Sequence, residues 1–166
     1  MIYRGRVFKF SDDINTDLII SGRYKFAITD MKALSRHLFE DIRPGFYQEI
    51  IANRSIIVSG HNFGMGSSRE QAPWVIKEAG ILCVIAKSFA RIFYRNAFNI
   101  GLGLIEADTD RIIEKDELEV NVKNGIIKNV TKRREIEFSP WNNFQANLIK
   151  SGGIIRYLEK NKGFKI

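Results

Sequence analysis

The order of apolar and polar residues along the chain predicts strands and helices in alternation. Residues 3–10 alternate in polarity and contain many β-favouring types, which predicts a short N-terminal strand. Residues 55–59 and 81–86 are short, mostly apolar runs of the kind found in buried strands. The segment between them has apolar residues at helical spacing, namely Ala72, Val75, Ile76 and Ala79. Strand, helix and strand in this order build a parallel sheet, with ligands at the carboxyl ends of the strands.

Further elements are predicted before and after this unit. Apolar residues at helical spacing predict a helix from Asp30, its candidate cap, to about Asp41. A second stretch carries an aromatic and apolar set at Phe89, Ile92, Phe93 and Ala97, and core packing is the favoured interpretation for its aromatic residues. The remaining sequence predicts a strand, a group of short strands around an Asn-Gly turn, and two helices, at residues 101–106, 116–138, 142–150 and 153–161. Together these elements predict a single α/β domain over residues 1–166.

The composition is that of a globular protein. The chain has 166 residues, of which 45% are hydrophobic, enough for a substantial core. Residues 1–6 lack the apolar centre of a signal peptide. No run approaches the roughly 18 apolar residues of a membrane span. We therefore expect a cytoplasmic protein with no membrane partner.

The charge of the chain is strongly positive, with a formal net charge of +7. Its lysines and arginines are dispersed, and the densest cluster, at residues 132–134, is followed directly by Glu135. None of the recognition signatures of nucleic-acid-binding proteins is present in the sequence. We therefore expect no nucleic-acid partner, and interpret the charge as a solvated surface that also attracts an anionic substrate or an acidic partner.

The sequence offers few ligands for a metal. Cys83 is the one cysteine, and it lies in an apolar run, where a buried and inert thiol is expected. An iron–sulfur cluster normally takes three or four thiolates. The two histidines, His37 and His61, are too few for an internal metal site. If the chemistry needs a metal, another chain must carry it.

Residues 59–70 form the stretch best suited to chemistry. Gly64 and Gly66 let the backbone turn tightly and approach a ligand. The next residues, two serines and Arg69, lie at a predicted helix N-terminus, where free N–H groups favour a carboxylate or phosphate. The same residues also match a capping box. In it, the Ser67 side chain accepts a hydrogen bond from the N3 amide, and the Glu70 side chain accepts one from the Ser67 amide. Both interpretations stay open, although the doubled serine favours function because a cap needs only one.

Two further polar groups complete the candidates. The acidic turn at residues 11–17 has three aspartates, but it lacks the glycine and glutamate that an EF-hand loop requires, which excludes that calcium site. Arg91, Arg95 and Asn96 could either rim a site or form the solvated face of a helix.

In this order, the motifs resemble those of isopropylmalate dehydratase small subunits, the swivelling domain of the aconitase superfamily. The resemblance rests on Asp12-Asp13-Ile14-Asn15-Thr16-Asp17, Gly22-Arg23-Tyr24, Asn62-Phe63-Gly64-Met65-Gly66-Ser67-Ser68-Arg69-Glu70 and Ala86-Lys87-Ser88-Phe89-Ala90-Arg91-Ile92-Phe93-Tyr94-Arg95-Asn96. It implies a swivelling β/β/α domain with a mixed sheet flanked by helices. It also implies a large-subunit partner that holds a [4Fe-4S] cluster, with no cofactor or metal in this chain.

The resemblance implies roles for individual residues. Ser67 is the candidate general base that removes a carbon-bound proton, and Arg69 helps to stabilise its alkoxide. Ser68 and Arg69 bind a substrate carboxylate, with Gly66 beside them. Asp17 organises the site, and an Asx turn is its alternative. The implied activity is a hydro-lyase that exchanges 2-isopropylmalate and 3-isopropylmalate in leucine biosynthesis.

Residues 22–27 correspond to the loop that, in this family, contacts the variable part of a hydroxy-dicarboxylate substrate. The candidate substrate-binding residues are Arg23, Tyr24, Lys25 and Phe26. Homoaconitase-like relatives have an arginine where this chain has Phe26, and an aromatic ring packs on an isopropyl group rather than a carboxylate. Isopropylmalate is therefore favoured, although Arg23 or Lys25 could reach an acidic tail. Alternatives are the small subunit of a homoaconitase or of a dimethylmalate or citramalate hydro-lyase, or a basic anion-binding module without catalysis.

Overall fold

The computed structural model describes residues 1–67 and 70–163, and within them seven strands form one mixed sheet. In sheet order the strands are β4 (Gly103–Glu106), β3 (Ile81–Ala86), β2 (Ser55–Val58), β1 (Ile2–Lys9), β5 (Glu117–Asn121), β6 (Ile126–Asn129) and β7 (Arg134–Glu137). The neighbouring pairs among β1 to β4 are parallel, whereas β5 pairs antiparallel with β1 and is followed by antiparallel β6 and β7. The predicted N-terminal strand, the parallel strands and the group of short strands are confirmed.

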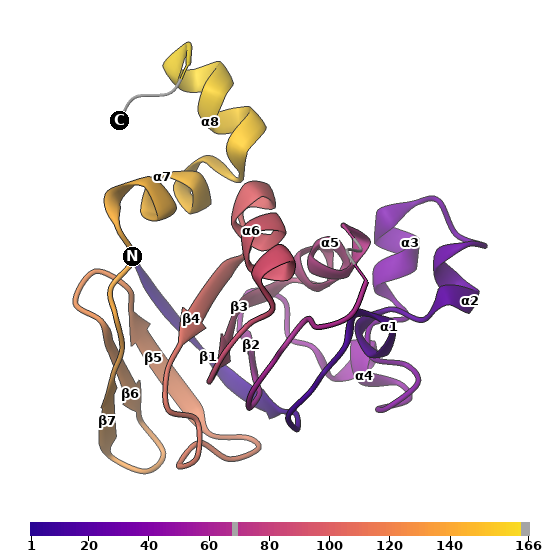
Figure 1. The fold of residues 1–166 in the computed structure, drawn as a ribbon. Coiled ribbons are helices and arrows are strands. Elements are labelled where there is room, and N and C mark those ends of the chain that lie inside the picture. The colour runs from indigo at the N-terminus through magenta and orange to yellow at the C-terminus, as the bar shows by residue number, and fades with distance from the viewer. Residues whose placement is uncertain (68–69, 164–166) are drawn as a thin grey trace.

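Eight helices in the described residues flank this sheet. They are α1 (Thr16–Ile19), α2 (Gly22–Lys25), α3 (Met31–Ser35), α4 (Phe46–Glu49), α5 (Gln71–Glu78), α6 (Arg91–Ile100), α7 (Asn143–Ser151) and α8 (Ile154–Asn161). Figure 1 shows α1 to α4 on one side of the molecule and the antiparallel strands β5 to β7 on the other. The β2–α5–β3 unit and both C-terminal helices occur where the sequence predicts them.

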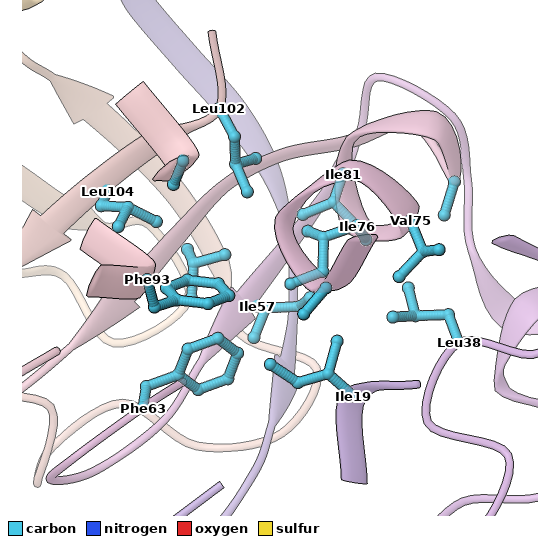
Figure 2. Close-up of a cluster of buried hydrophobic side chains, with 14 of the residues drawn as sticks. Ile19, Leu38, Ile57, Phe63, Val75, Ile76, Ile81, Phe93, Leu102 and Leu104 are labelled. Carbon is cyan, nitrogen blue, oxygen red and sulfur yellow. The ribbon is translucent and has the colours of Figure 1, made fainter. Parts of the chain in front are cut away.

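Alternating side chains of the parallel strands build two apolar cores. Phe8, Ile57 and Val84 occupy paired positions on one face, where they are buried against α5 and α6. Figure 2 shows this core, in which the rings of Phe63 and Phe93 lie 5.4 Å apart between centroids. The other face carries a second core, made chiefly of strand residues, which includes Val7, Ile56, Cys83, Ile105, Leu118, Val120 and Ile127. The antiparallel strands therefore help to cover the face that the helices leave open.

The loops that leave the parallel strands at their carboxyl ends are bonded to one another. The Ser59 hydroxyl donates to the Ser11 carbonyl at 2.6 Å, and the Thr109 hydroxyl donates to the Ser59 carbonyl at 2.8 Å. The Lys87 amide donates to the Gly60 carbonyl at 2.9 Å. Ser59 and Thr109 are buried, so these bonds satisfy polar groups that water does not reach. The edge at which parallel sheets bind ligands is thus cross-linked from within.

The predicted helix over residues 30–41 is shorter in the structure. Its start is confirmed, because the Asp30 side chain accepts a hydrogen bond from the Ala33 amide at 2.7 Å. It ends at Ser35, however, and Phe39 has a φ of +57°. The Phe39 ring stacks on Phe10 with centroids 4.2 Å apart, so the chain leaves the helix in a turn that buries this ring.

The helix predicted after the glycine–serine loop is present as α5. α5 starts at Gln71, and Glu70, in the N-cap position, makes no side-chain cap. The predicted capping box from Ser67 to Glu70 includes Ser68 and Arg69, which lie outside the described residues, so it stays a prediction. At Ser67 the chain is held by a tertiary contact, since its carbonyl accepts a hydrogen bond from the Thr16 hydroxyl.

Candidate active site

The loop between β2 and α5 turns over the carboxyl edge of the sheet at two glycines. Gly64 and Gly66 have φ angles of +81° and +93°, in the left-handed region that favours glycine. A Cβ at Gly64 would also lie 2.2 Å from Cγ of Phe93. The loop therefore passes so close to α6 that Gly64 is required by space as well as by conformation.

Side chains of the acidic turn before α1 bind this loop. The His61 amide donates to Oδ1 of Asp12 at 2.6 Å, and Nδ2 of Asn62 donates to Oδ1 of Asp13 at 2.8 Å. The Asp13 amide returns a bond to the His61 carbonyl at 2.8 Å. Gly60 makes room for this arrangement, because a Cβ there would lie 1.6 Å from Oδ1 of Asp12. The first two aspartates of the motif thus fix the loop.

Thr16, the first residue of α1, holds the end of the loop. Its amide donates to the Met65 carbonyl at 2.9 Å, and its hydroxyl donates to the Ser67 carbonyl at 3.0 Å. The Gly64 amide donates to the Ile14 carbonyl at 2.7 Å, so the two segments run side by side. Because Thr16 is only 2% exposed, these bonds are shielded from water. Thr16 therefore sets the position of Ser67.

The segment before α6 holds the same loop from the other side. The Asn62 amide donates to Oγ of Ser88 at 2.9 Å. The Phe63 amide donates to the Ser88 carbonyl, and the Ala90 amide donates to the Phe63 carbonyl, both at 3.0 Å. The loop is therefore fixed between α1 and α6 rather than extended into solvent.

A pocket of about 280 Å³ lies where the loop, α1 and α6 meet. It is lined by Thr16, Gly64, Gly66, Ser67, Ala90, Arg91, Ile92, Phe93 and Asn96. Hydroxyl, guanidinium and amide groups therefore share one pocket with an aromatic ring and aliphatic side chains. A pocket of this composition suits a small molecule that has both anionic and apolar parts.

The first turn of α6 forms one wall of this pocket. Ala90 occupies the N-cap position without a side-chain cap, so the amino end of this ten-residue helix contributes positive potential. Ile92 is 45% exposed and lines the pocket. Phe93 is buried as predicted, Ala97 is buried beside it, and Phe89 packs partly buried against the same core.

The predicted specificity segment does not line this pocket. Arg23 forms an ion pair with Asp41, and its guanidinium carbon lies 4.6 Å from the centre of the Tyr24 ring. Tyr24 in turn stacks on His37, with ring centroids 3.9 Å apart. These contacts anchor α2 to the turn after α3.

The end of the same segment faces solvent. Phe26 is 81% exposed, and Nζ of Lys25 lies 5.1 Å from the centre of its ring. The segment thus has an anchored inner part and an exposed aromatic tip. Phe26 is not among the residues that line the pocket at Ser67, and among the described residues the two parts of the candidate site lie on separate elements.

The other predicted site residues are placed as follows. Ser67 is exposed, and it lines the pocket together with Gly66. Asp17 is exposed in the first turn of α1, next to Thr16, and the helix cap is supplied by Asn15, which accepts from the Leu18 amide at 2.8 Å. Ser68 and Arg69 lie outside the described residues.

The charged groups at the neighbouring strand ends are paired within the chain. Lys87 forms an ion pair with Asp110 at 2.5 Å, which raises the pKa of Lys87 and lowers the pKa of Asp110. Nζ of Lys9 donates to the Thr109 carbonyl at 2.7 Å, and burial lowers the pKa of this lysine. These cations are therefore engaged in holding the loops together.

The described residues include no group of three or more His, Cys, Asp or Glu side chains that could hold a metal. Cys83 is buried in β3, and burial raises the pKa of its thiol. The prediction of a buried thiol is confirmed.

The sequence assigns no definite role to several residues of this pocket. Thr16 was part of a recognised motif, but nothing in the sequence showed that its hydroxyl reaches the loop. Arg91 and Asn96 were noted as candidates for a site rim, and the structure places both at the pocket. Arg95 is exposed and is absent from the lining. Ile92 shares the helical spacing of the apolar set but is exposed at the pocket.

The curled mixed sheet with flanking helices, and the glycine loop bonded across its carboxyl edge, define an aconitase-type domain. In agreement, the model of the aconitase C-terminal domain family matches residues 46–110, from α4 to the loop after β4. Over nearly its whole length, the chain also matches one particular family. It belongs to the 3-isopropylmalate dehydratase small subunits.

The relatives that show this family are similar over full length. The chain is 47% identical to 3-isopropylmalate dehydratase small subunit 1 of Thermotoga maritima, with 97% of each chain covered. It is 48% identical to small subunit 2 of Archaeoglobus fulgidus, with 98% of each chain covered. A crystal structure of 3-isopropylmalate dehydratase from Methanocaldococcus jannaschii superposes with a TM-score of 0.92 at 43% identity, covering 98% of this chain and 96% of that one.

Proposed function

We propose that this chain is the small subunit of an isopropylmalate isomerase, a hydro-lyase that exchanges 2-isopropylmalate and 3-isopropylmalate in leucine biosynthesis. The observation that carries the proposal is the full-length identity of 47–48% to small subunits of this enzyme. The pocket beside Ser67 supports it, because it combines polar donors with an apolar wall, as a malate with an alkyl substituent requires.

In this proposal, Ser67 is the base that removes the carbon-bound proton. A serine acts as a base only where its alkoxide is stabilised by positive potential. The amino end of α6 supplies such potential at the pocket, and Arg91 lines it as well. Arg69 adds a further cation by the family motif, with Ser68 binding a substrate carboxylate beside Gly66. Asp17 organises the site from the first turn of α1.

Binding of the substrate side chain is assigned to Phe26, the exposed tip of the α2 segment. Phe26 is 81% exposed, so its ring is available to pack on an isopropyl group once the two subunits meet. Arg23 is paired with Asp41 and Tyr24 is stacked on His37, whereas the exposed Phe26 ring has only Lys25 beside it. An apolar tip favours isopropylmalate over a substrate with a third carboxylate.

The [4Fe-4S] cluster of the enzyme is assigned to the large subunit. Clusters of this kind are held by several thiolates, and this chain has one cysteine, which is buried in the sheet. The donors of this chain therefore do not fit a cluster, and we assign no step through it to these residues. This chain contributes proton removal and substrate binding, and the large subunit completes the site.

The proposed setting is the cytoplasm, with the large subunit and a hydroxy-dicarboxylate as partners, and without nucleic acid or membrane. In the part of the chain that the structure describes, every helix is too short or too polar to cross a bilayer. The dispersed basic residues and the net charge of +7 suit an anionic substrate.

A substrate panel on the reconstituted complex tests this function. The purified chain is mixed with an isopropylmalate dehydratase large subunit, and rates are measured with isopropylmalate, homoaconitate, dimethylmalate and citramalate. We expect the highest kcat/KM with isopropylmalate. A preference for homoaconitate or for a smaller malate would assign the chain to the corresponding hydro-lyase. If the complex assembles but turns over none of these substrates, the enzyme function fails and an anion-binding module takes its place.

A further inference from the structure

Two polar side chains of α6, Arg91 and Asn96, line the same pocket as Ser67. We propose that they form a subsite for a substrate carboxylate on this subunit, in addition to the serine–arginine motif of the loop. The inference rests on the proposed function and extends it. It names a second element, α6, as a direct contributor to substrate binding.

The bonding state of these side chains supports a ligand. Among the described residues, neither the Arg91 guanidinium nor the Asn96 amide makes a hydrogen bond or an ion pair within the chain. By contrast, Arg23, Arg43 and Lys87 are each paired with carboxylates of the chain. An arginine that borders a pocket and has no internal carboxylate is suited to bind an external one, since its planar fork accommodates two carboxylate oxygens.

The surroundings of the pair match a substituted malate. Ile92 and Phe93 lie between Arg91 and Asn96 in sequence and line the same pocket, so donors and an apolar wall occur together. The Asn96 amide can donate to a carboxylate or a hydroxyl oxygen. A dicarboxylic substrate has two anionic ends, and a single serine–arginine motif can neutralise only one of them. A second donor group on α6 therefore has a chemical purpose.

The helix itself provides controls. Arg95 has the same charge, is one turn further along α6 and is exposed, yet it does not line the pocket. Asn99 likewise carries the same amide as Asn96 and lies outside this pocket, near α8. Matched variants at these positions change the charge or polarity of α6 equally, so a difference between them reports contact with the ligand.

The test compares Arg91→Gln with Arg95→Gln, and Asn96→Ala with Asn99→Ala, in the complex with saturating large subunit. Because Arg91→Gln removes a charge-assisted hydrogen bond and Asn96→Ala a neutral one, we expect the first to raise KM roughly 10-fold or more and the second about fivefold. The control variants should stay within about twofold of the wild type, because exposed charges interact weakly.

A second measurement identifies the group that Arg91 binds. Inhibition constants are measured for a 2-alkylmalate and for its two monoamides, in wild-type and Arg91→Gln complexes. The substitution should raise the inhibition constant of the dicarboxylate. It should leave unchanged the inhibition constant of the monoamide that already lacks the carboxylate bound by Arg91.

An equal rise in the inhibition constants of all three inhibitors would overturn the assignment. So would a variant that binds the large subunit more weakly while KM at saturation is unchanged, since Arg91 would then contact the partner. In either case the wild-type complex would still turn over isopropylmalate. Loss of the proposed function itself would appear differently, as an inactive wild-type complex.

Discussion

Ser67 lies at a position that several independent contacts determine. Its carbonyl is bound by Thr16, and the preceding glycines turn the chain so that Ser67 borders the pocket. We expect Ser67→Ala to lower kcat at least 1000-fold, the order of effect seen when a base of this kind is removed, while the subunits still assemble. Steady-state kinetics together with gel filtration of the mixed subunits check this. A turnover rate near that of the wild type would remove Ser67 as the base.

Thr16 is expected to act through Ser67 rather than on the substrate. Thr16→Val keeps the shape of the buried side chain but removes the hydroxyl that donates to the Ser67 carbonyl at 3.0 Å. We expect kcat to fall about 10-fold with KM nearly unchanged, because a misplaced base slows proton transfer more than it weakens binding. Thr16→Ser retains the hydroxyl and should restore most of kcat. If the serine variant is as slow as the valine variant, the hydrogen bond is not the cause.

Phe26 is predicted to determine the substrate side chain. Phe26→Arg exchanges an exposed ring for a cation, which should raise the kcat/KM ratio of homoaconitate to isopropylmalate by at least 10-fold, about 1.4 kcal/mol. Ile155→Arg adds the same charge at another exposed position, on α8, and serves as the control. An unchanged ratio in Phe26→Arg, or an equal shift in both variants, would mean that the specificity segment has been misassigned.

At the scale of residues, the sequence predicted which residues belong to the candidate site but not all of their contacts. The loop motif led to Ser67 and Gly66, and both line the pocket. It could not reveal that Thr16, 51 residues away, bonds to Ser67, because that contact depends on how α1 crosses the sheet edge. Arg23 was a candidate substrate contact, but the pairing with Asp41 emerges only from the turn that ends α3.

At the scale of elements, the close contact between the glycine loop and α6 holds the pocket together. Gly64→Ala places a methyl group 2.2 Å from the Phe93 ring and forces alanine to a φ of +81°. We expect the free energy of unfolding to fall by more than about 2 kcal/mol, measured by urea denaturation.

Gly45 provides the matched control for that substitution. Its φ is +77°, but the nearest atom to an added Cβ is 3.5 Å away. Gly45→Ala should therefore cost only the conformational strain, about 1 kcal/mol. Equal losses in the two variants would show that contact with Phe93 is unimportant.

Most elements could be predicted because their local patterns and their tertiary surroundings agree. β2, β3 and the helix between them have apolar residues at the spacing their burial requires, and Asp30 caps α3 as its type predicts. An exception arises where tertiary packing overrides the local pattern. α3 stops early so that Phe39 can enter the core.

At the scale of the whole molecule, the site is arranged as one half of a larger one. The pocket at Ser67 is open to solvent on the edge of the sheet, and the exposed tip at Phe26 belongs to a separate element. Neither part surrounds a substrate by itself. The order of motifs along the chain identified this family, but how they meet at the carboxyl edge depends on parallel pairing between strands far apart in sequence.

The most direct test of a divided active site is a titration of this chain with the large subunit. Isopropylmalate turnover is recorded as the large subunit is added to a fixed amount of the chain, with each subunit alone as reference. We expect no turnover from either subunit alone, and a rate that rises on mixing and saturates as the complex fills. A large subunit that is as active alone as in the mixture, or an assembled complex that remains inactive, would contradict the account.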